Sequence, residues 1–177
     1  MDKRLLKKWS IIGVFFVFVL ASGWHFLYSD VVKCGITAVV APVNESPWEH
    51  SKLFFVPAII WYAIMYFIAG RKFPNYVFSH AIALLVMPAV MLLLFYGYTL
   101  FVPDNLPLDI IESFIVVAFG QFVGYKLTVS KLKLSGTGFI IAAAVIVLGM
   151  LAVYIAFTYS PLHWGPMQDP TDMHYGI

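Results

Sequence analysis

The chain has 177 residues, of which 62% are hydrophobic and only 11% charged, and its mean hydropathy is +0.88. Soluble globular domains are about 45–50% apolar and about 25% charged, so this composition excludes a water-soluble fold. The single cysteine, Cys34, excludes an intrachain disulfide and a cysteine-based metal motif. No basic run or stacking platform points to nucleic acid. We therefore expect the lipid bilayer to be the main partner.

Apolar runs predict an all-α membrane protein with five transmembrane helices in one bundle. About 20 residues at 1.5 Å each cross the roughly 30 Å hydrocarbon core. A segment before the second helix is apolar but interrupted by Gly35 and Pro42, which predicts an interfacial or re-entrant piece covered by protein. The predicted spans are about 10–29, 47–70, 76–102, 108–126 and 139–159, with the interrupted segment at 30–46 and a tail at 160–177.

Two local patterns concern how the helices begin and pack. Ser46-Pro47-Trp48-Glu49 has the form of a capping box, in which Ser46 caps the amide of Glu49 and Glu49 reaches back to Ser46. Gly120 and Gly124 form a GxxxG pattern, which favours close helix packing and offers a contact for a homo-oligomer.

The distribution of lysine and arginine predicts the orientation. The N-terminus and the connections after the second and fourth spans hold nine of the eleven, whereas only Lys33 and Lys52 lie on the other side. The positive-inside rule then places the N-terminus in the cytoplasm and the C-terminus outside. We expect a multi-pass protein of the cell membrane, with a bacterial cytoplasmic membrane favoured.

The side predicted to be outer collects four of the five histidines and eight of the nine acidic residues. Histidine and carboxylate together can bind Zn, Mn or non-haem Fe and can act in acid–base chemistry. The candidate catalytic residues are Glu45, Glu49 and His50, and the candidate metal ligands are His25, Glu45, His50 and Glu112. Glu49 and Glu112 have a structural alternative, because acids near a helix start complement its dipole. The alternative for His25 is a hydrogen-bonded residue at the membrane interface. The capping role of Glu49 shifts the expectation toward Glu45 and His50.

The passage Pro42-Val43-Asn44-Glu45-Ser46-Pro47-Trp48-Glu49-His50-Ser51-Lys52-Leu53 resembles the signature of a family of small bacterial integral membrane proteins of unknown function. That pattern has the form PVNES-x-WEH-x-KL. The run Gly23–Tyr28 and the ending Asp169–Ile177 also resemble the family. The resemblance implies a small multi-pass membrane protein, and it assigns no activity to the chain. It covers His25, Asn44, Glu45, Glu49, His50, Asp169 and Tyr175.

Two hypotheses follow, and the sequence leaves the choice open. In the first, the histidines and carboxylates converge under the C-terminal tail into a polar or metal site. Hydrolysis or group transfer on a lipid-like or small substrate is then the expected class. In the second, the protein is a structural, accessory or transport-associated membrane protein, and the polar passage only caps the second helix. A carrier or channel is disfavoured because no span carries a charge in its middle.

Overall fold

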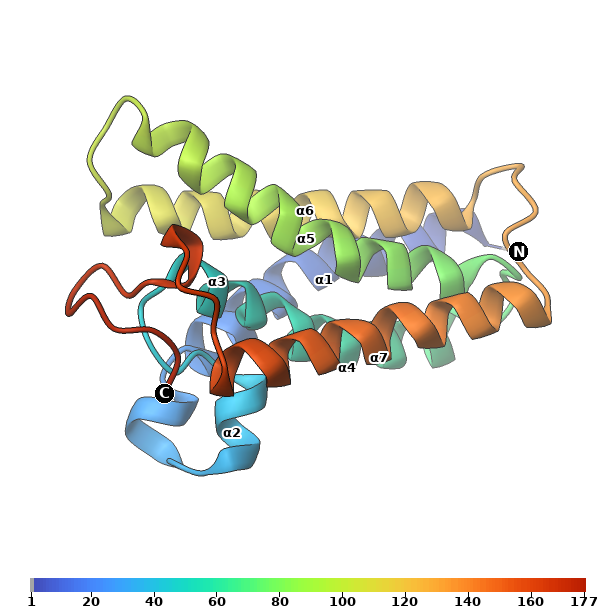
Figure 1. The fold of residues 1–177 in the computed structure, drawn as a ribbon. Helices are drawn as coiled ribbons and strands as arrows, with labels where there is room; N and C mark the ends of the chain where they lie inside the picture. The colour runs from blue at the N-terminus through green and yellow to red at the C-terminus, as the bar shows by residue number, and fades with distance from the viewer. Residues whose placement is uncertain (1) are drawn as a thin grey trace.

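The computed structural model describes residues 2–177 and shows a bundle of helices (Figure 1). Within these residues there is no β-strand, and one isolated bridge joins Gln168 to Tyr175 in the tail. Five helical segments of the described chain are long and apolar enough to cross a membrane. They are α1 (Lys3–Trp24), the composite segment Pro47–Gly70, α5 (Tyr76–Thr99), α6 (Leu106–Thr128) and α7 (Thr137–Tyr159). The predicted all-α membrane fold is confirmed.

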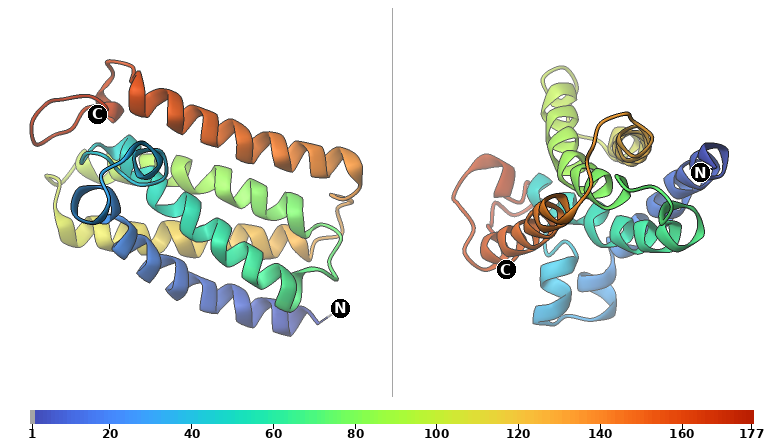
Figure 2. Two further views of the ribbon diagram at one scale, coloured as in Figure 1. Left: turned by 90° about the horizontal axis from the view of Figure 1, so that it is seen from below. Right: turned by 90° about the vertical axis from the view of Figure 1, so that its right-hand side faces the viewer.

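Helix α5 lies in the middle of the bundle, in contact with α6 on one side and α7 on another (Figure 2). Helix α1 packs on α6 and on α4 (Phe55–Met65), which belongs to the composite segment. The N-terminus and C-terminus lie at opposite ends, as five crossings require. One face of each helix therefore packs inward, while apolar side chains of the outer faces remain exposed for lipid.

Glycines let two pairs of helices approach closely. Gly13 of α1 faces the buried ring of Trp61, and a side chain at residue 13 would overlap that ring. Gly120 and Gly124 of α6 face Met87 and His80 of α5 in the same way. The GxxxG pattern thus packs against α5 within one chain, and α5 and α6 are the two helices in most extensive contact. Its use in a homo-oligomer stays a prediction.

The second membrane segment is built from four short helical pieces. Helix α3 (Pro47–His50) is followed by a 3₁₀ turn, η2 (Ser51–Phe54), then α4, then a π-helical turn, η3 (Tyr66–Gly70). Pro57 explains the irregular turn, because its ring excludes the carbonyl of the residue four positions earlier and it has no amide hydrogen. The break separates the helical geometry of the first turns, α3 and η2, from that of α4.

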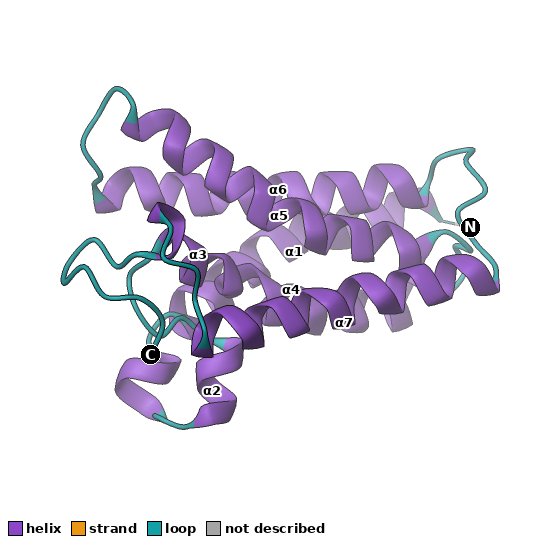
Figure 3. Ribbon diagram, in the orientation of Figure 1, coloured by secondary structure: helices purple, strands orange, loops and turns teal. Residues whose placement is uncertain are grey.

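Connections at the two ends differ in size (Figure 3). We call the end that holds residues 25–46, 100–105 and 160–177 the polar end. There the π-helical turn η1 (Leu27–Val31) and the short helix α2 (Gly35–Val40) project from the bundle, and the tail folds over α3 with a 3₁₀ turn, η4 (Gly165–Met167). The segment 30–46 is thus partly helical and lies at this end of the bundle.

Candidate metal and ligand site

Three side chains from three separate segments meet at the polar end. His25 directly follows α1, Glu45 lies in the loop between α2 and α3, and His50 is the last residue of α3. The two Nε2 atoms of the histidines are 3.0 Å apart. Oε2 of Glu45 lies 3.5 Å from Nε2 of His25 and 3.4 Å from Nε2 of His50. We call this group the His/Glu triad.

These spacings suit a single metal ion. Ligand atoms bound to one zinc ion at about 2.0–2.1 Å with tetrahedral angles lie about 3.3 Å apart. The three separations in the triad, 3.0, 3.4 and 3.5 Å, bracket that value. Two imidazoles with one carboxylate are also the ligand set of catalytic zinc sites and of non-haem iron sites. The triad therefore fits a divalent transition metal in both donor type and geometry.

Backbone contacts orient His50 for this role. Its Nδ1 lies 3.1 Å from the carbonyl oxygen of Ser46, which can only accept, so Nδ1 carries the hydrogen. Nε2 of neutral His50 then has a free lone pair pointing at His25. Metal-bound histidines are typically held by a second hydrogen bond of this kind. A metal ion would take the place of the single hydrogen on Nε2 of His25, which both His50 and Glu45 face.

The charges in the triad attract one another. The hydrogen bond with Glu45 raises the pKa of His25 above its ordinary 6.5, although burial acts in the opposite direction. The same hydrogen bond lowers the pKa of Glu45 below 4.5. Without metal, the pair stabilises the folded protein below about pH 6.5, and this contribution is lost as the pH rises through the raised pKa of His25. It is also lost in acid, once Glu45 becomes protonated.

The triad borders a cavity of about 520 Å³. Its walls come from α1, α3, the start of α6 and the end of α5, and Pro170 and Thr171 of the tail complete it. Much of the lining is apolar, including Phe54 and Met91. Pockets of roughly 300–1,000 Å³ with apolar walls and a few polar groups are typical of small-molecule sites. The triad thus lies where a bound molecule could reach it.

The structure places the other two predicted site residues differently. Glu112 of α6 lines the same cavity but is outside the triad. Glu49 does not line the cavity and forms a buried ion pair with Lys52, whose Nζ lies 2.5 Å from its Oε2. Glu49 and His50 are consecutive on a helix, so their side chains point about 100° apart. His50 therefore reaches the triad while Glu49 faces α7.

The ion pair belongs to a fully buried polar network. Nζ of Lys52 donates to Glu49, to the carbonyl of Ala38 in α2 and to the hydroxyl of Thr158 in α7. These three acceptors match the three donors of an ammonium group. Glu49 also accepts from the amide of Val43 at 3.1 Å. The network ties α2, α3 and α7 together, and it was the main site feature that sequence reasoning missed.

The cap of α3 forms with one change of partner. The hydroxyl of Ser46 accepts from the amide of Glu49, as the capping box predicts. The carboxylate of Glu49 does not return the contact, because the ion pair holds it. Asn44 takes that place, and its Oδ1 accepts from the amide of Ser46 at 3.0 Å.

The C-terminal tail holds the loop that carries Glu45. Buried Asp169 accepts from the amide of Glu45 at 2.9 Å, and Asn44 donates to the carbonyl of Gly176 at 3.0 Å. Burial favours the neutral form of Asp169, but hydrogen bonds from Thr171 and Glu45 lower its pKa below the usual value. The resemblance included Asn44 and Asp169, which was the one signal in the sequence for this contact.

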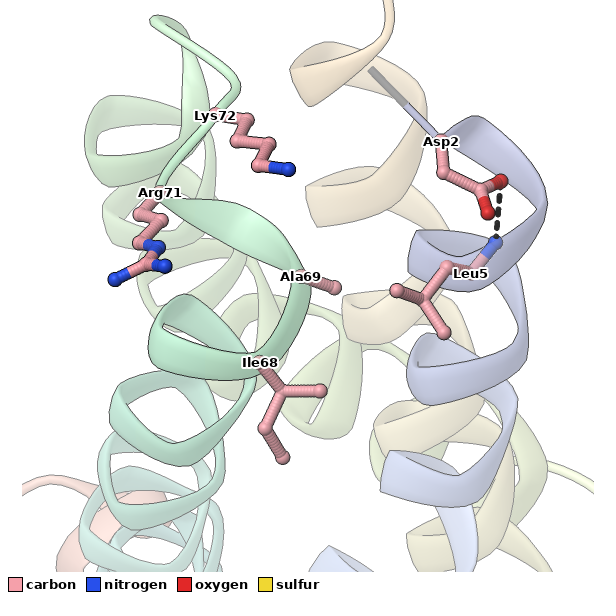
Figure 4. A pocket seen from close by; sticks show the side chains of 6 residues that line it. All are labelled: Asp2, Leu5, Ile68, Ala69, Arg71 and Lys72. Atoms are coloured by element: carbon pink, nitrogen blue, oxygen red, sulfur yellow. Dashed lines mark hydrogen bonds between the residues drawn. The ribbon is translucent and has the colours of Figure 1, made fainter.

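A second hollow, of about 370 Å³, lies at the opposite end of the bundle (Figure 4). Arg71 and Lys72 line it from one side and Asp2 and Leu5 from the other. The carboxylate of Asp2 caps α1 by accepting from the amides of Arg4 and Leu5. Its acid is engaged as a cap, and none of the described residues that line it is a histidine, so this part of the structure lacks the donor set of the triad.

Comparison with known proteins identifies the family. The Family of unknown function (DUF6512) matches residues 1–177. The chain belongs to this family. No curated protein and no solved structure gives a significant match. The predicted membership in a family of unknown function is confirmed, and DUF6512 brings no activity with it.

Proposed function

We propose that this membrane protein binds one divalent transition metal ion, zinc in the first instance, through His25, Glu45 and His50. The observation that carries the proposal is the mutual approach of these three ligand atoms, all within 4.8 Å of one another. A metal with three protein ligands keeps a position for water or substrate, and it acts as a Lewis acid or lowers the pKa of the bound water. The proposed chemistry is hydrolysis or group transfer on an amphiphilic molecule.

We further propose that the polar end faces the exterior of the cell. The support comes from the nine lysines and arginines at and near the opposite end, which the positive-inside rule assigns to the cytoplasm. The cavity beside the triad would then receive substrate from the outer half of the bilayer or from the exterior.

The metal content of purified protein tests the first proposal. The protein in detergent is incubated separately with Zn²⁺, Mn²⁺ and Fe²⁺, dialysed, and analysed by mass spectrometry for bound metal. We expect one zinc ion per chain. The variants His50→Ala and Glu45→Gln are expected to lose more affinity than the about 10–100-fold that loss of a supporting group costs.

His174→Ala is the matched control. His174 lies at the same end and also pairs with a carboxylate, that of Asp172 at 3.3 Å, but both side chains are exposed. We expect this variant to bind zinc like the unmodified protein. Folded protein that takes up none of the three metals, or His50→Ala protein that binds as well as the control, would overturn the proposal.

A purely structural role is the alternative function, and it explains other residues of the segment 44–52. Ser46 caps α3, Lys52 and Glu49 join three helices, and Asn44 fixes the tail. These contacts favour a structural role for those four residues. They do not use the Nε2 atoms of the two histidines, nor the carboxylate of Glu45. The metal measurement therefore separates the two functions at the residues where they differ.

A further inference from the structure

We propose that the cavity beside the triad binds a molecule with a protonated amine on an apolar chain. This inference deepens the proposed function by naming a ligand class. It rests on that function only in treating the cavity as a ligand site, and it does not require the metal. The evidence lies on the opposite wall of the cavity, where α5 ends and α6 begins.

That wall carries three carboxylates, those of Asp104, Asp109 and Glu112. Asp104 and Asp109 share one donor, the hydroxyl of Tyr98, at 2.9 and 2.5 Å. One hydroxyl hydrogen cannot satisfy two carboxylates, each of which has about four acceptor sites. Like charges this close favour a cation or a proton between them.

Glu112 supplies an independent observation. Its side chain lines the cavity although the residue is only 6% exposed. Its Oε1 is buried and has no hydrogen-bond partner among the described residues. A buried carboxylate oxygen without a partner is costly, and a carboxylate within a membrane segment is a functional candidate by default. A ligand with hydrogen-bond donors would satisfy it.

The charge balance of this wall favours a cation, because the two histidines of the lining face Glu45 on the other side of the cavity. Among the described residues that line the cavity, none is a lysine or an arginine. At this end of the bundle, Lys52 is engaged in the network with Glu49, and Lys33 lies in the projecting segment near Tyr28. An ammonium group carries three donors and one positive charge, which matches unpaired carboxylates. An anionic head group would be repelled by the same wall.

The remaining lining selects the apolar chain. Phe18, Phe54 and Phe95 present aromatic rings, which attract cations and pack against hydrocarbon. Leu106 and Ile110, also in the lining, are 70% and 48% exposed on the outside of the bundle. The cavity thus borders a surface suited to acyl chains, and a ligand could enter sideways from the bilayer.

Octylamine is the test probe, with octanol as the uncharged match. Binding is measured by equilibrium dialysis with the full chain in phosphatidylcholine nanodiscs, and protein-free nanodiscs correct for partitioning. We expect one octylamine per chain in excess of the lipid background and no excess octanol. Glu112→Gln and Asp109→Asn, which keep shape but remove charge, should each weaken octylamine about tenfold or more.

Zinc binding separates this inference from the metal proposal. Glu112→Gln protein should still bind zinc, which also shows that it is folded, and His50→Ala protein should still bind octylamine. Replacing one-third of the lipid by phosphatidylethanolamine distinguishes the sources: competition with octylamine identifies a lipid head group, and no competition identifies a free amine. Equal binding of octanol, or unchanged octylamine binding in both carboxylate variants, would overturn the inference.

Discussion

Replacing Lys52 by Met tests whether Glu49 has a structural role. Lys52 and Glu49 side chains are 1% and 2% exposed, so neither charge is solvated. Methionine is of similar length to lysine but carries no ammonium group. The substitution therefore leaves the carboxylate of Glu49 with two donors, the amide of Val43 and a distant hydroxyl, that of Thr158 at 3.5 Å. Leaving one member of a buried ion pair alone costs about 3–5 kcal/mol.

A double-mutant cycle isolates the pair. We expect Lys52→Met to lower the free energy of unfolding by about 4 kcal/mol. The double variant Glu49→Gln with Lys52→Met should recover about 2 kcal/mol of the sum of the single losses, because no buried charge remains. Reversible unfolding in mixed detergent, followed by tryptophan fluorescence, gives these values.

Two outcomes would refute this reasoning. A loss below about 1 kcal/mol in Lys52→Met would show that the carboxylate is solvated or neutral without its partner. Strict additivity of the two substitutions would show that the residues do not interact. Zinc binding by the double variant provides the control for function, because the network lies outside the cavity and we expect zinc affinity to be retained.

Three further predictions concern orientation, the tail and pH. Cys34 is exposed, and hydrogen bonds from Thr37 lower its pKa, so it should react with a membrane-impermeant maleimide on intact cells. A cysteine placed at the opposite end, by Ser135→Cys in a Cys34→Ser background, should not react. The reverse pattern refutes the proposed orientation. Asp169→Ala should weaken zinc binding about tenfold by freeing the Glu45 loop, whereas exposed Asp172→Ala should not, and equal titrations would contradict this role of the tail. Zinc affinity should fall at least about tenfold per pH unit below the raised pKa of His25, because this ring must lose its proton to bind the metal. An affinity unchanged between pH 8 and 5 excludes this histidine as a ligand.

The candidate site was only partly predictable. Glu45, Glu49 and His50 lie within six residues, and their chemical types point to a metal or an acid–base site regardless of how each side chain is directed. The direction depends on helix phase: the turn through α3 sends His50 toward α1 and Glu49 toward α7. No pattern in the sequence indicated that Lys52 would be buried rather than exposed at the interface.

The sequence by itself determined that lipid surrounds most of the chain, that the fold is helical and that five helices are long enough to span a membrane. The reason is that burial in lipid demands runs of about 20 apolar residues with internal hydrogen bonds. It also separated the basic end from the acidic and histidine-rich end. The tertiary structure decided which polar residues meet. His25, Glu45 and His50 come from three segments, and the loop that carries Glu45 is hydrogen-bonded to a tail more than 120 positions away. Such convergence is set by packing and long-range hydrogen bonds, which no local pattern encodes.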